Sequence, residues 1–202
     1  MDDIVLRGMA KWPNVPAVYG WLTLTRRGRW HIKGDPVAHS AIEAFIARNY
    51  EHDRQGCWYF QNGPQRVFVT LDYTPLIYRA SNSADGALTL ESHVGTKPST
   101  VSGAWFDENG TLIVETECGV GIIHDRDLEC LTSAFADTHG NRLSESELDQ
   151  SLERMQRNQE LGLYIKYCHS TVPVQAIQSK EVPVRFGFNP SPVTPKGQPE
   201  CP

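Results

Sequence analysis

The residues of this chain best suited to metal chemistry lie at 124–127, which read HDRD. Imidazole and carboxylate groups bind hard and borderline cations. No second spaced pair such as HExxH accompanies this run, and Asp125 or Asp127 could instead cap a helix that begins near Leu128. A metal-assisted hydrolase that uses His124, Asp125 and Asp127 is therefore the alternative hypothesis, and we expect no resident metal or other cofactor.

Two cysteines have neighbours that suggest nucleophilic chemistry. Cys57 precedes Trp58, and Cys168 precedes His169. Adjacent residues of a strand point to opposite faces, so Cys168 and His169 do not easily meet, and a small buried cysteine explains both positions. The sequence has no GxSxG motif for an acyl-transfer serine. Whether the protein catalyses a reaction is therefore left undecided by its sequence.

Aromatic residues are concentrated in residues 53–79, DRQGCWYFQNGPQRVFVTLDYTPLIYR. Neighbours such as Trp58, Tyr59 and Phe60 must alternate between the two faces of a strand. If one face packs on a helix at 39–50, the other presents aromatic rings beside arginines, a surface that can bind an anionic ligand or a protein partner. Burial against another layer of the same domain is the competing interpretation. The residues expected to bind a ligand are His31, Tyr59, Arg66, Tyr73 and Arg79.

Composition narrows the class of protein. The chain has 202 residues, of which 40% are hydrophobic and 21% charged, and its net charge is -5. These values are typical of a folded protein and argue against nucleic-acid binding, which usually needs a basic face. Five cysteines without CxxC spacing favour a reducing cytoplasm. The acidic start, MDD, is unlike a signal peptide, and no apolar run reaches the roughly 18 residues of a membrane span.

Glycine-centred turns predict the strands. Gly28, Gly56, Gly86 and Gly110 are each followed by apolar residues at the second and fourth positions. Glycine permits the positive φ of a hairpin turn, and alternate apolar residues place side chains on one sheet face. Their spacing is irregular, so we interpret them as a recurring hairpin rather than as a true repeat. With further candidates at 63–72, 74–80, 100–106 and 119–125, seven to ten strands are expected.

Helical patterns are fewer. Asp2 or Asp3 can cap a short helix that runs through Lys11, and residues 39–50 have the apolar spacing of one amphipathic helix. Another helical stretch is expected at 124–135, and Ser144 with Glu147 forms a capping box for a later helix. Strands are expected at 162–178 and at 182–188.

These elements predict the α+β class, with a mostly antiparallel curled sheet or partly open β-barrel, one packed helix and peripheral helices. We expect a single domain over residues 1–188, which could comprise two β subdomains meeting near residues 80–100. From residue 189 the chain holds five prolines in fourteen residues and is expected to form a disordered tail.

Two longer stretches carry a resemblance. Residues 1–34, MDDIVLRGMAKWPNVPAVYGWLTLTRRGRWHIKG, and 42–79, beginning IEAFIARNYEHDRQGCWYF, resemble a family of uncharacterised proteobacterial proteins described as a domain of unknown function. Gly28-Arg-Trp30, Gly34-Asp-Pro36 and Asp53-Arg-Gln-Gly56-Cys-Trp58 more faintly resemble a second uncharacterised proteobacterial family. The resemblance implies a bacterial β-rich domain and brings no catalytic residue to this chain.

The leading hypothesis is a non-enzymatic cytoplasmic domain that binds a small molecule or a protein partner through the aromatic face of its sheet. A homodimer is one arrangement that would fit this role. Neither nucleic acid nor a membrane is an expected partner.

Overall fold

The computed structural model describes residues 1–12, 15–83, 87–156, 162–168 and 170–195. Contacts divide the chain into two compact units. The first unit comprises Met1–Pro75 together with Pro183–Pro202, and the second comprises Leu76–Val182. The expectation of a single domain over residues 1–188 stays a prediction.

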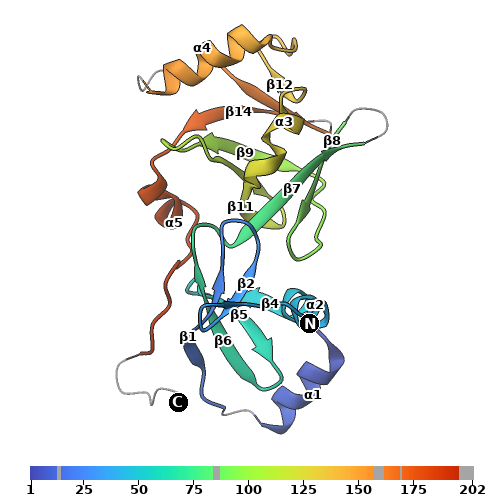
Figure 1. The fold of residues 1–202 in the computed structure, drawn as a ribbon, viewed down its shortest axis with the longest axis vertical. Helices are drawn as coiled ribbons and strands as arrows, with labels where there is room; N and C mark the ends of the chain where they lie inside the picture. Colours follow the sequence, from blue (N-terminus) through green and yellow to red (C-terminus); the bar gives the residue numbers. More distant parts are fainter. Residues whose placement is uncertain (13–14, 84–86, 157–161, 169, 196–202) are drawn as a thin grey trace. The chain divides into compact units, whose positions relative to one another are not determined.

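The first unit is built on a six-stranded sheet in the order β3-β2-β1-β6-β5-β4 (Figure 1). Most neighbours are antiparallel, but β1 and β6 run parallel. The strands are β1 Val18–Leu24, β2 Trp30–Ile32, β3 Asp35–Pro36, β4 Tyr50–His52, β5 Trp58–Asn62 and β6 Gln65–Leu71.

Two helices accompany this sheet where the sequence predicted them. They are α1 Asp3–Lys11 and α2 Ser40–Arg48. The α2 helix lies against the sheet through β5 (Figure 1). Asp2 is the N-cap residue of α1, but its side chain makes no capping hydrogen bond.

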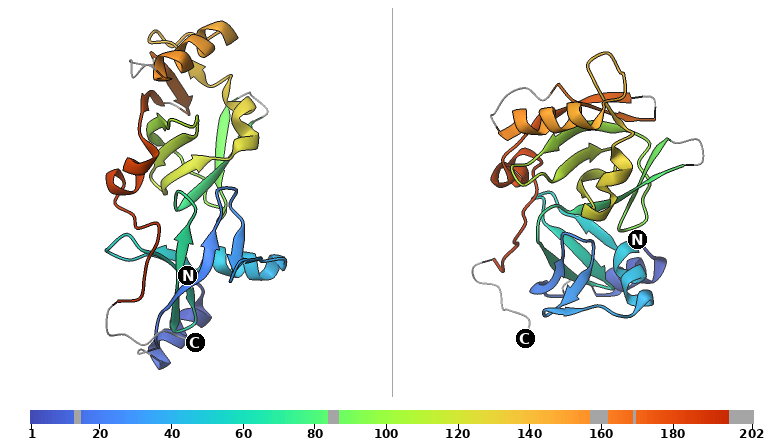
Figure 2. Two further views of the ribbon diagram at one scale, coloured as in Figure 1. Left: turned by 60° about the vertical axis from the view of Figure 1, so that its left-hand side comes forward. Right: turned by 45° about the horizontal axis from the view of Figure 1, so that its top comes forward.

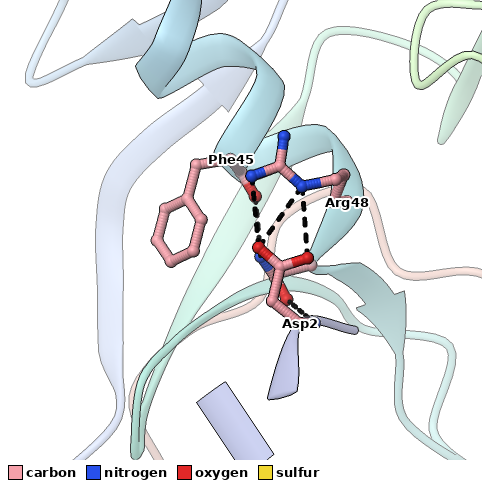
Figure 3. Close-up of polar contacts among 4 residues, drawn as sticks. Asp2, Phe45 and Arg48 are labelled. Carbon is pink, nitrogen blue, oxygen red and sulfur yellow. Dashed lines mark hydrogen bonds and ion pairs between the residues drawn. The ribbon is translucent and has the colours of Figure 1, made fainter. Parts of the chain in front are cut away.

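The Asp2 carboxylate binds α2 instead. It accepts hydrogen bonds from Arg48 Nε at 3.1 Å and from Asn49 Nδ2 at 3.3 Å (Figure 3). Asn49 is fully buried, and its Oδ1 accepts the backbone N–H of Asp2 at 2.8 Å. Its Nδ2 also donates to the Phe45 carbonyl. These contacts join the start of α1 to the end of α2, and Arg48 lowers the pKa of Asp2.

The second unit has an eight-stranded sheet in the order β12-β13-β14-β9-β10-β11-β7-β8. The sheet is curled, as the two views of Figure 2 show. Two pairs, β11 with β7 and β14 with β9, are parallel. The strands are β7 Leu76–Asn82, β8 Leu88–Ser92, β9 Val101–Phe106, β10 Leu112–Thr116, β11 Gly119–Ile123, β12 Phe135–Ala136, β13 Tyr164–Tyr167 and β14 Ser170–Ala176.

Short helices complete the chain. They are η1 Asp125–Asp127, α3 Leu128–Leu131, α4 Glu145–Gln156, η2 Ser179–Glu181 and α5 Val182–Arg185. The predicted capping box begins α4, because Ser144 N–H donates to Glu147 Oε2 at 2.8 Å and Glu147 N–H returns to Ser144 Oγ at 3.4 Å. Within the described residues, no helix is long and apolar enough to cross a membrane.

The two units share a strand order that the sequence did not reveal. In each, a hairpin is followed by a three-stranded meander whose last strand pairs in parallel with the first strand of the hairpin. The order is β2-β1-β6-β5-β4 in the first unit and β8-β7-β11-β10-β9 in the second. The recurring hairpins of the sequence are therefore parts of one supersecondary arrangement that occurs twice.

The equivalent turns between β4 and β5 and between β9 and β10 are built alike. Oδ1 of Asp53 accepts N–H groups two and four residues further along, both at 2.9 Å, and Oδ1 of Asp107 does the same at 2.9 and 2.8 Å. Gly56 and Gly110 follow with φ of 75° and 76°. In each hairpin, the aspartate side chain stabilises the turn, and the glycine that follows adopts the left-handed backbone conformation that the turn requires.

Several predicted elements differ in the structure. Fourteen strands occur among the described residues, more than expected, because many are only two to five residues long. The helix predicted at 124–135 is only η1 and α3, and the strand at 162–178 is the β13–β14 hairpin. The strand predicted at 182–188 is wrong, since α5 occupies Val182–Arg185.

The expected tail begins inside the first unit. Asn189 N–H donates to the Gly56 carbonyl at 2.9 Å, and the Pro190 carbonyl accepts from Leu71 N–H at 2.8 Å. The rest of the predicted disordered segment, at residues 196–202, lies outside the described residues.

Candidate functional site

Strand β5 places its aromatic residues on opposite faces of the first sheet, as the alternation predicts. Phe60 meets Phe45 of α2 edge-on, with ring centroids 5.4 Å apart. Trp58 lies against Tyr50 of β4 at 4.7 Å. Tyr59 points the other way, because successive side chains of a strand alternate. One face of the sheet therefore packs under α2, and the opposite face carries the candidate site.

Tyr59 is part of a packed group that we call the aromatic cluster, comprising Tyr19, Cys57, Tyr59 and Phe68. Tyr19 stacks on Phe68 with ring centroids 4.6 Å apart, and Tyr59 meets Phe68 edge-on at 5.8 Å. Tyr59 is only 5% exposed, while Tyr19 is half-buried. Offset and edge-on aromatic pairs add to the stability from burial. The cluster is thus a small core with one accessible ring rather than an open platform.

Arg66 adds a cation to this face. Its guanidinium lies over the Tyr59 ring, 4.7 Å from the centroid, and its side chain is exposed. Arg66 pairs across the β5–β6 ladder with Gln61. The Oε1 atom of Gln61 is buried and, among the described residues, has no hydrogen-bond partner. Because its side chain is exposed, Arg66 can meet a ligand from solvent.

The ionisable groups of the cluster are held neutral. Burial raises the pKa of Tyr59, and the positive charge of Arg66 partly opposes this. Burial and the nearby Asp53 carboxylate raise the pKa of the Cys57 thiol. A reactive cysteine needs a lowered pKa to supply thiolate at neutral pH. Cys57 is accordingly a packed, protonated thiol and not an activated nucleophile.

His31 and Tyr73 lie apart from Arg66. His31 is half-buried in β2 and shares the face of Tyr59, since it pairs with Thr23, which in turn pairs with Thr70 of β6. Thr70 lies four residues, or about 13 Å, from Arg66 along β6. His31 lies two strands away from Thr70, which is about 10 Å across the sheet. Tyr73 is buried beyond the end of β6. Neither residue adjoins Arg66 closely enough to share one small ligand with it.

Tyr73 instead packs with a cation from the turn that precedes β2. The Arg26 guanidinium lies 4.3 Å from the centroid of the Tyr73 ring. Similarly, the Lys33 ammonium lies 3.6 Å from the centroid of the Trp21 ring. Both cations belong to the turns that flank β2.

Arg79 belongs to the second unit and binds Asp127. Its Nε and Nη2 atoms lie 2.5 and 2.9 Å from the two carboxylate oxygens. Ala80 N–H also donates to Asp127 Oδ2 at 3.0 Å. The hydrogen bonds from Arg79 lower the pKa of Asp127. This arginine bridges β7 to η1 within the second unit, whereas Tyr59 and Arg66 belong to the first unit.

The residues of the alternative metal site, His124, Asp125 and Asp127, make polar contacts within the protein. His124 is buried, burial lowers its pKa, and its Nδ1 accepts Arg126 N–H at 3.2 Å. His124 thus caps η1. Asp127 is the N-cap residue of α3, as one of the two predicted alternatives, but its side chain makes no capping hydrogen bond there. With both oxygens of Asp127 committed to hydrogen bonds, nothing favours metal binding there. Over the described part of the chain, no group of three or more His, Cys, Asp or Glu side chains could hold a metal ion.

Two contributors to the site were not predicted. Tyr19 belongs to β1, where the register shifts between Val18 and Leu22, so simple alternation does not predict its side. Asn189 reaches the site from the far end of the chain and places Nδ2 3.6 Å from Cys57 Sγ. A sequence pattern could have suggested Tyr19 as another aromatic next to a strand, but gives no signal for Asn189.

Comparisons with known proteins place the chain among uncharacterised families. The family model DUF2944, described as "Protein of unknown function (DUF2946)", matches residues 1–193. A DUF1285 family protein from Silicibacter pomeroyi DSS-3 has a similar structure, with a TM-score of 0.52 and 14% identity over 84% of this chain and 86% of that chain. At such low identity the likeness shows the fold alone.

A DUF1285 family protein from Shewanella baltica OS155 matches less well. Its TM-score is 0.41 and its identity 14%, over 52% of this chain and 85% of that chain. No curated protein matches this sequence.

Proposed function

The chain belongs to the DUF2944 family of proteins of unknown function, and from this premise and the geometry of the site we propose that its first unit is a non-enzymatic binding domain. The ligand is an anionic group, a carboxylate or a phosphate, held by Arg66 above Tyr59. The group belongs either to a small molecule or to an acidic segment of a protein partner, encountered in the cytoplasm.

The observation that carries this proposal is the exposed guanidinium of Arg66, stacked on a ring that is itself fixed by the aromatic cluster. A planar guanidinium is matched to the geometry of carboxylate and phosphate oxygens. Stacking on Tyr59 restricts the side chain before the ligand arrives, so less conformational entropy is lost on binding. The arrangement thus favours recognition of an anion without requiring a reactive group.

The distribution of charge supports the same ligand class. The first unit has eleven Lys and Arg against eight Asp and Glu, whereas the second has eight against sixteen. The first unit is therefore net positive within a protein whose total charge is -5. Net charge of one sign raises the local concentration of counter-ions and speeds their association.

The test is an NMR titration of 15N-labelled full-length protein at constant ionic strength. Phosphate, citrate and an acidic hexapeptide are the probes, and sodium chloride is the matched salt. We expect shifts centred on Tyr59, Arg66 and Phe68, and Arg66→Gln to weaken binding by about tenfold or more, which is about 1.4 kcal/mol. Tighter binding of the peptide than of citrate would identify a protein partner as the source of the anion.

Arg29→Gln is the matched control, because Arg29 is exposed in the same unit and its loss changes the charge equally. Equal weakening by Arg29→Gln and Arg66→Gln would show only general electrostatic attraction and would contradict the proposed site. Tyr59→Ala is unsuitable as a test, since this buried ring supports the aromatic cluster and its removal lowers stability regardless of any ligand.

A further inference from the structure

A short C-terminal segment, Gly187–Ser191, enters the first sheet, and we call it the strap. Asn189 N–H donates to the Gly56 carbonyl, and the Pro190 carbonyl accepts Leu71 N–H. Asn189 also forms an isolated parallel bridge with Cys57. The strap therefore binds the backbone at the start of β5 and at the end of β6, two places that are adjacent in the sheet.

The strap occupies a position where strand pairing would otherwise continue. The antiparallel ladder of β5 and β6 extends from the pair Asn62–Gln65 to the pair Tyr59–Phe68. Beyond this pair, the backbone groups of Gly56 and Leu71 bind the strap. Without it, a carbonyl and an N–H would be open to any extended backbone, as at the edge of a sheet.

The strap also covers part of the aromatic cluster. The Asn189 side chain reaches Cys57 Sγ at 3.6 Å, and its Oδ1 accepts Ser191 N–H at 3.0 Å. Cys57 is 9% exposed and packs with Tyr59 and Phe68. Movement of the strap would therefore uncover the thiol and one side of the cluster together.

Few backbone hydrogen bonds attach the strap to the sheet. Among the described residues, its backbone hydrogen bonds to the sheet are one donated by Asn189 and one accepted by Pro190, and proline has no N–H with which to extend the pairing. Phe188 is the one buried side chain of the strap. Gly187 has a φ of 65°, which departs from strand geometry. Segments held by few hydrogen bonds open with much lower free energies than the global unfolding of a protein.

We propose that Gly187–Ser191 is a releasable strap, and that the slot it fills between β5 and β6 accepts an extended peptide backbone. The resident occupant is the chain's own Gly-Phe-Asn-Pro-Ser sequence. Strap release governs access to the aromatic cluster beside Arg66. Its effect on anion binding rests on the proposed function, whereas release itself is independent of any anion and is measured separately.

The test compares two equivalent glycines. A Cβ at Gly56 would lie 2.1 Å from the Gly187 carbonyl oxygen and 2.8 Å from Phe188 Cα, so Gly56→Ala must push the strap away. A Cβ at Gly110 meets nothing within 4 Å. Both glycines have the same turn and nearly the same φ. Gly110→Ala therefore reproduces the backbone strain without affecting the strap.

The readout is the rate at which iodoacetamide alkylates Cys57 in the full-length protein, measured by mass spectrometry of the peptide that contains it. Exposed Cys168 provides an internal reference. We expect Gly56→Ala to accelerate alkylation of Cys57 by about tenfold or more, because the thiol reacts only from the open form. Gly110→Ala should leave the rate unchanged.

A second variant, Asn189→Ala, loosens the strap without altering the turn and should also accelerate alkylation. A synthetic peptide of the sequence of residues 186–194, FGFNPSPVT, should then slow the reaction in this variant. The same peptide with alanine in place of its asparagine should protect less. This part of the experiment tests whether the slot accepts a peptide in trans.

Unchanged alkylation in both folded strap variants would overturn the proposal, as would equal acceleration by Gly56→Ala and Gly110→Ala. Failure of the peptide to protect Cys57 would overturn the peptide-accepting slot. Circular dichroism and melting temperature identify any variant that is simply unfolded. No anion is present in these measurements, so their failure is distinguishable from failure of the anion site.

Discussion

The two units share a strand order but fill equivalent positions differently. When Gly56 is aligned with Gly110, Tyr59 corresponds to Ile113 and Phe68 to Ile122. All four side chains are buried. The exposed Arg66 corresponds to Val120, which is buried. The same topology thus supports an aliphatic core in one unit and an aromatic, cationic face in the other.

This difference separates what the fold needs from what it does not. The shared features, an aspartate turn and apolar residues at paired positions, are sufficient to form the arrangement in both units. A cation over an aromatic ring is not required by the topology, since Val120 and Ile113 occupy those places in the second unit. The Arg66–Tyr59 pair is therefore the better candidate for a specialised role.

The largest effect is expected at the aromatic cluster. Phe68→Ala removes a ring that contacts both Tyr19 and Tyr59, and should lower the free energy of unfolding by about 3–5 kcal/mol. Ile122→Ala, at the corresponding place, should cost about 2–5 kcal/mol. Urea unfolding followed by 19F NMR of fluorotryptophan provides the measurement, because Trp105 reports the second unit and the other four tryptophans report the first.

The same experiment tests the single-domain expectation. A single cooperative domain requires all five resonances to keep one shared midpoint in Phe68→Ala. A lower midpoint for the four tryptophans of the first unit, with Trp105 unchanged, would contradict that expectation and establish two independently unfolding units.

A smaller effect is expected where an ion pair distinguishes the second unit. Asp127→Ala removes the partner of Arg79 and leaves the buried Ala80 N–H unsatisfied, so it should cost about 2 kcal/mol. Thr23 corresponds to Arg79 in the first unit, and Thr23→Ala should change stability by less than about 0.5 kcal/mol. Chemical denaturation checks both. Equal losses would show that the Arg79–Asp127 pair adds nothing specific to the second unit.

The smallest effect concerns pH. Glu117 accepts hydrogen bonds from Ser99 N–H and Oγ and from Thr100 N–H and Oγ1, and these lower its pKa from the ordinary 4.5 to about 2. A lowered folded-state pKa stabilises the protein above the unfolded pKa, and this contribution is lost as pH falls from about 4.5 to about 2. Salt and solvent exposure keep the effect modest.

Glu117→Gln should therefore flatten the acid limb of the stability curve in this window. The measurement is the urea midpoint reported by Trp105 at several pH values between about 5 and 2.5. A curve as steep as that of the unmodified protein would show that other carboxylates, such as Asp127, account for its acid sensitivity.

Membership in DUF2944 and the likeness to a DUF1285 structure confirm the sequence resemblance to uncharacterised proteobacterial families. The helices and sheets of the structure confirm the α+β class. Within the fold, the helix at 39–50, the capping box at Ser144 and the opposite orientations of Tyr59 and Phe60 were predictable. Each depends on residues no more than a few positions apart, whose geometry is set by local periodicity and hydrogen bonding.

The sequence alone determined where the chain turns and which side chains of a strand share a face, because φ and the alternation of side chains are local properties. Only the tertiary structure decided that β1 pairs in parallel with β6, that Asp127 engages Arg79, and that Asn189 reaches Cys57. These contacts join residues up to 132 positions apart. Their formation depends on chain packing and long-range pairing, whose partners leave no local pattern in the sequence.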